Sequence, residues 1–388
     1  MRRILTPVCL CVPISYTTIL RYTTLHYTTP NTPSPTNASS PPSQAQIPPC
    51  RHAVAPRGKP LQVPPPTPWE RLTRSPTLFL ASCIYTHLPP ITPPLSLSPP
   101  IRVVCISDTH NHVVDDVPDG DILIHAGDLT NGGSVAEIQA QISWLSSLPH
   151  AEVIVISGNH DTYLDPRTRP SLSDSQREGS LDWGRVHYLQ HKLLTLTLSP
   201  QTHTTDSRTP LLRDGKQRRL RIYGAPQIPA CGPMSVHAFQ YPRGSDAWSE
   251  TVPEEVDVLI THTPPKYHMD LTMPMGLGCE HLLKEVKRVK PVLHVFGHVH
   301  WGAGREVVYW DRAHEAYVQG MGTQSRYTRG VLNPKLWWNV VRVLYRGVRE
   351  LLWDKVWGGQ SAHTILVNAA QIKGNTGKLG NPVQVVEI

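Results

Sequence analysis

Runs of hydrophobic, mostly β-branched residues recur along the chain from residue 101 onward, and five of them end in polar side chains. The runs cover residues 103–106, 122–126, 153–156, 258–260 and 292–296. Runs of this length and composition predict buried strands. Nearly every position within them is apolar, as expected for strands whose two faces are both covered. The pattern predicts an α/β domain that begins near residue 101.

Helical periodicity lies between the strands. Ser134 is suited to cap a helix, and Glu137 follows three residues later, which is the pattern of a capping box. Apolar residues then recur at helical spacing as far as Pro149, and a second helix is predicted over 279–289. Strands and helices in this order are compatible with a single open sheet or with two packed sheets, and the pattern alone leaves both open.

A longer amphipathic segment covers residues 335–353. At about 100° per residue, one face gathers apolar side chains and the other gathers basic ones. The apolar face consists of Trp337, Val340, Val341, Leu344, Val348, Leu351 and Leu352. One interpretation is a helix that folds back over the domain and buries this face. The other is peripheral contact of residues 335–357 with a membrane surface, because three arginines in the middle of the segment argue against a spanning helix.

Residues 1–100 differ from the rest in composition. They hold 22 of the 39 prolines, and Glu70 is their only acidic residue. Such a segment buries too little apolar surface to offset its chain entropy, so we predict a disordered tail over residues 1–100. The tail carries eight basic residues against one acid, whereas the remaining 29 basic and 29 acidic residues cancel. The neutral folded region argues against a nucleic-acid partner.

The tail also bears on location. A basic pair precedes an apolar stretch from Ile4 to Ile14, which admits an N-terminal targeting segment. Pro7 and Pro13 interrupt that stretch, so a disordered tail or a poorly defined start of the reading frame is the favoured interpretation. The seven cysteines include no Cys-x-x-Cys pair, which favours reduced thiols and a cytoplasmic location. Association with a membrane surface remains the alternative.

The polar residues that follow the five hydrophobic runs are of types that bind metals. They are Asp108 and His110, Asp128, Asn159 with His160 and Asp161, His262, and finally His298 and His300. In α/β sheets, ligands bind beyond the carboxyl ends of the strands, so these side chains are expected at one edge. Carboxylate, amide and imidazole groups together suit divalent Mn, Fe or Zn.

The order Asp-x-His, Gly-Asp, Gly-Asn-His-Asp, His and Gly-His-x-His resembles the calcineurin-like metallophosphoesterase superfamily. Residues 107–110, 125–128, 221–226, 261–265 and 293–298 resemble its metallophosphoesterase-domain-containing branch, which is MPPED-type and class III phosphodiesterase-like. The resemblance implies an α/β sandwich of two mixed β-sheets flanked by helices, in a domain over 101–388. Residues 312–361 lie outside the resemblance, and we predict that they form an inserted, tryptophan-rich amphipathic helical segment.

The resemblance also implies roles for the residues at the strand ends. It assigns Asp108, His110 and His300 to a first divalent metal ion and Asn159, His262 and His298 to a second, with Asp128 bridging the two. It makes His160 a proton donor or charge stabiliser at the leaving group, and Asp161 a carboxylate that orients His160 or its neighbours. His112 is predicted to be a loop residue that could meet substrate. His125 and His294, in mid-strand, are predicted to be core or supporting histidines.

The function implied by the resemblance is metal-dependent hydrolysis of a phosphate ester. A phosphodiester, cyclic nucleotides included, or a phosphomonoester would be cleaved by in-line attack of a metal-bridging hydroxide. A diesterase is favoured over a protein phosphatase, because nothing in the sequence marks a docking domain. The alternative is a catalytically weak nucleotide-binding or scaffold member of the same fold, against which the complete set of seven predicted ligands argues. The oligomeric state stays open.

Overall fold

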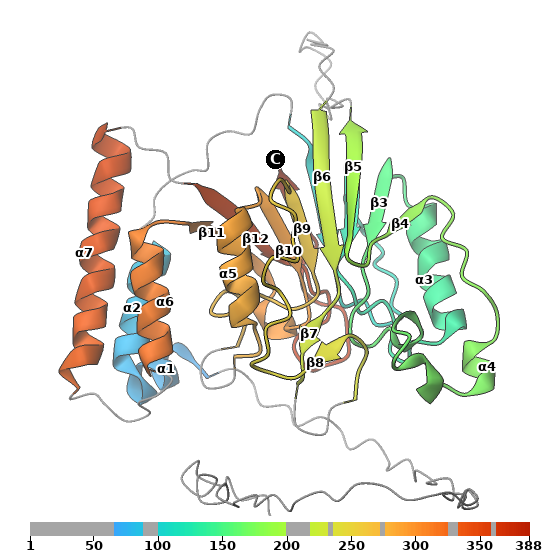
Figure 1. Cartoon of the computed structure of the whole chain (residues 1–388), viewed down its shortest axis with the longest axis horizontal. Helices are drawn as coiled ribbons and strands as arrows, with labels where there is room; N and C mark the ends of the chain where they lie inside the picture. The colour runs from blue at the N-terminus through green and yellow to red at the C-terminus, as the bar shows by residue number, and fades with distance from the viewer. Residues whose placement is uncertain are drawn as a thin grey trace, which may run out of the picture. The chain divides into compact units, whose positions relative to one another are not determined.

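A computed structural model describes residues 66–87, 100–198, 218–231, 236–271, 276–324, 333–357 and 362–388. Most of its strands belong to two mixed β-sheets (Figure 1). The first sheet has the strand order β13-β1-β2-β3-β4, in which β1 to β4 are parallel and β13 is antiparallel to β1. Its strands are β1 (Arg102–Ile106), β2 (Ile122–His125), β3 (Glu152–Val155), β4 (Val186–Tyr188) and β13 (Gln384–Glu387).

The second sheet has the order β11-β12-β10-β9-β6-β5, with antiparallel strands only at its two edges. Its strands are β5 (Lys192–Leu198), β6 (Arg218–Ala225), β9 (Val258–Thr261), β10 (Leu293–Phe296), β11 (Gly304–Tyr309) and β12 (His363–Asn368). A small parallel ribbon joins β7 (Ile228–Pro229) to β8 (Gln240–Tyr241).

The main hydrophobic core lies between the two sheets. Val103 and Ile124 of the first sheet belong to one buried cluster with Ile222, Val258 and Val295 of the second. The outer face of the first sheet packs against α3 (Val135–Ser147), and that of the second packs against α5 (Glu280–Val289). Because both faces of each central strand are covered, the strands are hydrophobic throughout. The prediction of two packed mixed sheets is confirmed, and the single open sheet is excluded.

The caps of the two long helices in the sandwich agree with their sequences. The Ser134 side chain accepts from the backbone N–H of Glu137, whose carboxylate accepts from the Ser134 backbone N–H, so the predicted capping box forms. The predicted helix over 279–289 begins at Glu280, and Cys279 is its N-cap. Shorter helical turns are α4 (Asp174–Arg177), Thr162–Leu164, Arg169–Ser171 and His300–Gly302.

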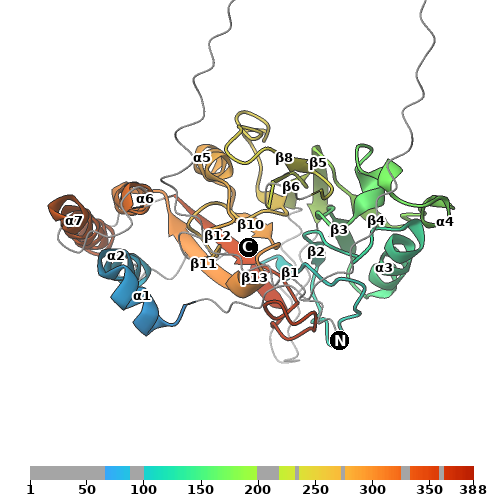
Figure 2. The ribbon, with the colours of Figure 1, turned by 90° about the horizontal axis from the view of Figure 1, so that it is seen from below.

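Four further helices pack together into a helical unit, which contacts the rest of the domain through Tyr267 and His268. They are α1 (Pro68–Arg74), α2 (Pro76–His87), α6 (Arg312–Gln324) and α7 (Pro334–Trp357). α2 packs on both α6 and α7 (Figures 1 and 2). Their shared core joins Tyr85 of α2 to Ala316 and Tyr317 of α6 and Val343 of α7. In the sequence, α6 and α7 lie between β11 and β12, and these two strands pair in the sheet. The predicted helical insertion is therefore a single connection between two adjacent strands.

The predicted disorder over residues 1–100 is wrong for residues 68–87. The proline content of the segment suggested that no packed structure could form, but Pro68 and Pro76 each stand at the first position of a helix, where proline is tolerated. Thr67 and Glu70 complete a capping box for α1. The partner that these helices need is the insertion some 230 residues later. The apolar stretch from Ile4 to Ile14 lies outside the described residues.

The prediction that α7 folds back over the domain is wrong, because α7 packs mainly on α2 and α6, and of its predicted apolar face only Val340 is buried. The buried residues of α7 are Leu336, Val340 and Val343, and Val343 packs against Ala316 and Tyr317 of α6. Of the predicted face, Val341, Leu344 and Val348 are exposed. The periodicity identified an apolar helix without selecting its buried face, because apolar side chains cover more than half of the circumference. Among the described residues, no helix is long and apolar enough to cross a membrane.

Two adjacent residues test this assignment of faces. Val343 is 1% exposed and Leu344 is 45% exposed. We expect Val343→Asp to lower the free energy of unfolding by about 2–5 kcal/mol, because it buries an unpaired charge. Leu344→Asp should change it by less than about 0.5 kcal/mol, as is usual for surface substitutions. Urea unfolding followed by circular dichroism measures both values. Equal losses would show that the Leu344 face is also packed.

Candidate metal centre

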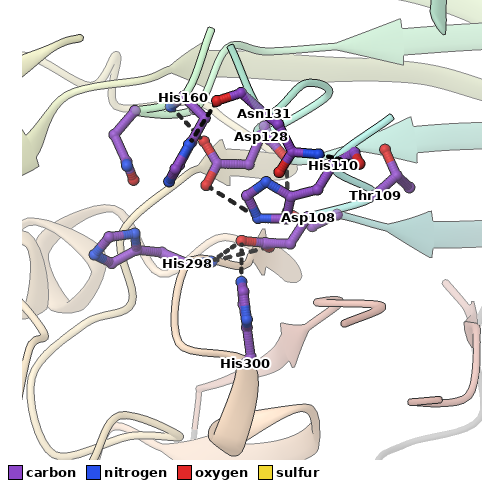
Figure 3. Close-up of polar contacts among 12 residues, drawn as sticks. Asp108, Thr109, His110, Asp128, Asn131, His160, His298 and His300 are labelled. Atoms are coloured by element: carbon purple, nitrogen blue, oxygen red, sulfur yellow. Dashed lines mark hydrogen bonds and ion pairs between the residues drawn. The ribbon is translucent and has the colours of Figure 1, made fainter. Parts of the chain in front are cut away.

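The polar side chains at five strand ends converge at one edge of the sandwich. Asp108 and His110 follow β1, Asp128 follows β2, and Asn159 follows β3. His262 follows β9, and His298 and His300 follow β10, so the second sheet contributes the remaining three. Figure 3 shows His110 between the carboxylates of Asp108 and Asp128, with His300 pointing at Asp108. The predicted single edge is therefore built from two facing sheets.

The backbone at these strand ends takes unusual conformations. Asp108, Asp128 and His298 have φ values of 53°, 55° and 66°, in the left-handed region that few residues other than glycine adopt. Asp and His visit this region more often than most residues, and such strain is concentrated at functional sites. Gly297 is required because a Cβ there would collide with the Asp108 carboxylate. The turns bring the side chains closer together than extended strands could.

Asp108 is the centre of the first group. Its carboxylate accepts the His298 backbone N–H at 3.0 Å and 3.1 Å, and the Nε2 atom of His300 lies 3.2 Å from Oδ1. Burial opposes ionisation, but the hydrogen bond from His300 and the nearby histidines hold the pKa of Asp108 below its usual range. Atoms of Asp108, His110 and His300 lie close enough together to hold one ion.

Asp128 belongs to two more groups. Its Oδ1 atom accepts the His160 backbone N–H at 2.8 Å. Its Oδ2 atom lies 3.7 Å from Nε2 of His110 and 3.4 Å from Nε2 of His262. Asp128 therefore stands between the Asp108 group and a further group made with His262 and His298. Asn159 adds an amide oxygen, since its Oδ1 atom is 3.2 Å from Nε2 of His262.

Three of the histidines are held in the same way. The Nδ1 atoms of His110, His262 and His300 lie 3.2 Å, 2.9 Å and 2.8 Å from the backbone carbonyls of Thr130, Ala126 and Gly374. A carbonyl can only accept, so each Nδ1 carries a proton and each Nε2 faces a carboxylate. Metal-binding histidines usually donate their other N–H to such a partner. The Nε2 atom of His110 is buried and has no hydrogen-bond partner, which fits a bound cation.

The protonation of the histidines follows from the same contacts. Burial lowers the pKa of His110. Burial also acts to lower the pKa of His262, but the Asp128 carboxylate beside it raises this pKa to about 9. A proton on His262 thus balances the buried carboxylates, and a divalent cation between the same atoms could replace it.

His298 has a neighbour that the sequence did not indicate. The Sγ atom of Cys231 lies 3.4 Å from Nε2 of His298. Cys231 follows β7, outside the five hydrophobic runs, and belongs to no motif. Only the folded chain brings it to the site.

His160 and Asp161 have different surroundings, although they are adjacent in the chain. The Nδ1 atom of His160 lies 3.1 Å from the Asn131 carbonyl, and its ring is 4.9 Å from the ring of His110. The Asp161 carboxylate is buried and accepts the backbone N–H groups of Leu129, Thr130 and Gly158. Among the contacts of the described residues, it does not bind the His160 ring. Its hydrogen-bond partners belong to the turns after β2 and β3 instead.

The mid-strand histidines support the site without entering it. The Nε2 atom of His125 lies 2.9 Å from the Thr109 hydroxyl, and that of His294 lies 2.8 Å from the Thr261 hydroxyl. Each threonine is adjacent to a predicted ligand. Both histidines are fully buried, which agrees with the predicted core or supporting role.

A cavity of about 280 Å³ opens at the site. It is lined by His110, Asp128, Asn131, Asn159, His160, His298, His300, Ile372, Gly374, Asn375 and Gly377. The segment 372–377 was not predicted, because it follows no hydrophobic run that ends in a metal-binding residue. His112 does not line the cavity. Its Nε2 atom lies 3.0 Å from the Gly377 carbonyl, so it contacts a lining segment from outside.

The family assignment rests on the sequence match over this same region. Residues 101–302 match the sequence model of the calcineurin-like phosphoesterases. The chain belongs to that family. The matched residues include all seven predicted ligands. This calcineurin-like phosphoesterase thus has a metallophosphoesterase domain in which buried His and Asp groups could hold metal ions.

Curated relatives share the domain but differ in length. Human metallophosphoesterase domain-containing protein 1 is 36% identical over 210 residues, which are 52% of this chain and 61% of that protein. UPF0046 protein C25E10.12 of Caenorhabditis elegans is 37% identical over 224 residues, 53% of this chain and 73% of that protein. A protein of Emericella nidulans named probable rhamnogalacturonate lyase C is 38% identical over 308 residues. This chain spans only 26% of its length, although 79% of this chain is matched.

The role of Asp161 can be tested by an isosteric change. Burial and the nearby Asp128 carboxylate raise the pKa of Asp161 to about 6, so at pH 8 the group is ionised and both oxygens accept hydrogen bonds. Asp161→Asn turns one acceptor into a donor that faces backbone N–H groups. We expect a loss of about 1–3 kcal/mol in the free energy of unfolding at pH 8, measured with urea.

Asp174→Asn is the matched control, since the Asp174 carboxylate is exposed at the surface. It should leave the unfolding curve unchanged. A wild-type unfolding curve for Asp161→Asn would contradict the structural role assigned to that carboxylate.

Proposed function

We propose that this protein is a dinuclear metal-dependent phosphoesterase that hydrolyses small phosphodiesters. The observation that carries the proposal is the position of Asp128. Its Oδ2 atom lies between the Nε2 atoms of His110 and His262, which belong to different groups of potential ligands. One carboxylate shared by two groups of ligands is an arrangement that suits two ions.

The chain divides the ligands between two ions. The first ion would be held by Asp108, His110 and His300. The second would be held by Asn159, His262 and His298, and Asp128 would bind both ions. Such a set of oxygen and imidazole ligands suits Mn, Fe or Zn. When bound, two divalent ions supply Lewis acidity toward the phosphoryl oxygens and lower the pKa of a water that attacks phosphorus.

His160 is the proposed proton donor to the leaving group. It lines the cavity and belongs to a third group with His110 and Asp128. The Asn131 carbonyl accepts its Nδ1–H, which leaves Nε2 to take up and release a proton. A histidine in this position can protonate a departing alkoxide, a role that typically contributes about 10²- to 10⁴-fold to the rate.

The cavity supports a diester over a monoester. Among the described residues that line it, none is lysine or arginine. A phosphodiester carries one negative charge, whereas a phosphomonoester at neutral pH carries nearly two. Beside two metal ions and a protonated His160, the described lining offers no further positive group, so the single charge of a diester is the better match. A catalytically weak nucleotide-binding member is the competing function, and measured turnover separates the two.

Metal content tests the dinuclear centre. We expect elemental analysis to find two divalent ions per chain in protein that was purified without chelators and reconstituted. His300→Ala should reduce this to one ion, because His300 belongs to the first group only. Asp128→Asn should weaken both ions, because its carboxylate is shared. A single ion in the wild-type protein would refute the dinuclear proposal.

Leaving-group dependence tests the role of His160. We expect His160→Ala to keep both metals and to lower turnover of an alkyl phosphodiester by about 10²- to 10⁴-fold. The loss should be smaller for a nitrophenyl ester, whose leaving group needs no proton. Asn159→Ala should instead lower metal content.

His187→Ala is the control for loss of an imidazole, since His187 pairs with Glu152 and does not line the cavity. It should leave turnover unchanged. An equal loss for His160→Ala on both kinds of ester would rule out proton donation by His160.

A further inference from the structure

α7 has three distinct faces. One is buried and consists of Leu336, Val340 and Val343. At about 100° per residue, a second face lies beside it and carries six large apolar side chains. We call this face the α7 stripe, and it comprises Trp338, Val341, Leu344, Tyr345, Val348 and Leu352. The third face carries basic residues.

The α7 stripe is unusual because its residues are contiguous. Its six side chains are 38% to 67% exposed, although α6 and α2 pack against another face of the same helix. Single exposed apolar residues are common on protein surfaces, whereas continuous apolar patches mark interaction sites. From Trp338 to Leu352 the stripe extends for about 21 Å along the helix axis. It is therefore long enough to lie on an extended apolar surface.

The basic face lies beside the α7 stripe, and acidic residues of α7 do not cancel its positive charge. α7 contains five basic and two acidic residues, for a net charge of +3. Arg342 donates to the neutral Gln319 side chain, and Arg346 donates to the Arg312 carbonyl. Neither arginine forms an ion pair with a carboxylate among the described residues, although Arg346 lies within electrostatic range of Glu315, and Arg349 on the same face pairs with Glu350. Their positive charges are available to a negatively charged partner.

We propose that the α7 stripe and the basic face beside it bind the surface of an anionic lipid membrane. A helix with an apolar face, aromatic residues at its margin and a basic face is suited to lie in the plane of the interface. Trp338 and Tyr345 have the amphipathic rings that favour the boundary between acyl chains and headgroups. A second copy of the chain is a poorer occupant, because pairing two stripes would bring two faces of like charge together.

The test uses the full chain and lipid vesicles of two compositions. We expect the protein to sediment with phosphatidylcholine vesicles that contain about 30% phosphatidylserine, and only weakly with phosphatidylcholine alone. Leu344→Asp should weaken binding to the anionic vesicles by about tenfold, because it places a charge in the apolar face. The double variant Arg342→Gln with Arg346→Gln should also weaken binding to the anionic vesicles by about tenfold. This loss should be seen only at low salt, because salt screens the charges.

Leu193→Asp is the matched control. Leu193 is 41% exposed on β5, compared with 45% for Leu344, so the same substitution is made at the same exposure on another surface. It should bind the vesicles like the wild-type protein. Hydrolysis of a soluble ester should be unchanged in all of these variants, which separates membrane binding from the activity of the metal centre.

Three results would overturn the proposal. The first is a wild-type protein that fails to sediment with anionic vesicles. The second is wild-type binding by Leu344→Asp, which would assign binding to the basic residues 1–100 rather than to α7. The third is a wild-type dimer in light scattering that Leu344→Asp converts to a monomer, which would make a second copy the occupant of the α7 stripe.

Discussion

Two buried carboxylates, Asp108 and Asp128, are the feature on which the rest of the site depends. Burying a charge is costly unless hydrogen bonds and opposite charges compensate for it. Here the backbone N–H groups of His298 and His160 point at the two carboxylates, and the imidazoles of His110, His262 and His300 surround them. The strand-end turns with positive φ bring these donors into range.

The two-sheet architecture explains why the site needs both halves of the domain. The first sheet supplies the carboxylates, and the second supplies His262, His298 and His300. The rigid core between the sheets holds these groups at fixed separations, since packed interiors do not deform continuously. A second layer of contacts adds to this rigidity. Backbone carbonyls fix the histidine tautomers, Asp161 binds the backbone of two strand-end turns, and His125 and His294 brace the neighbouring threonines.

The helical unit differs from the sandwich in the size of its core and in how its segments are joined. Its core is small and centres on Tyr85, Tyr317 and Val343, and it joins segments from far apart in the chain. Helices of this length are stabilised mainly by packing on partners rather than by intrinsic propensity. α7 carries more apolar surface than α2 and α6 cover. This surplus distinguishes it from α3 and α5, which cover the outer faces of the sheets.

The sequence alone predicted five central strands, the seven potential ligands that follow them and their common edge. Buried strands require continuous apolar runs, and metal-binding residues must follow those runs directly, so both signals are local. Tertiary structure decided the contacts made by Cys231, Asn131 and Gly374, which lie in loops without a local pattern. Tertiary structure also decided which face of α7 is buried and that residues 68–87 form helices. Both features depend on packing against a segment that is distant in the sequence. Composition and periodicity describe one segment at a time, so they could not predict this packing.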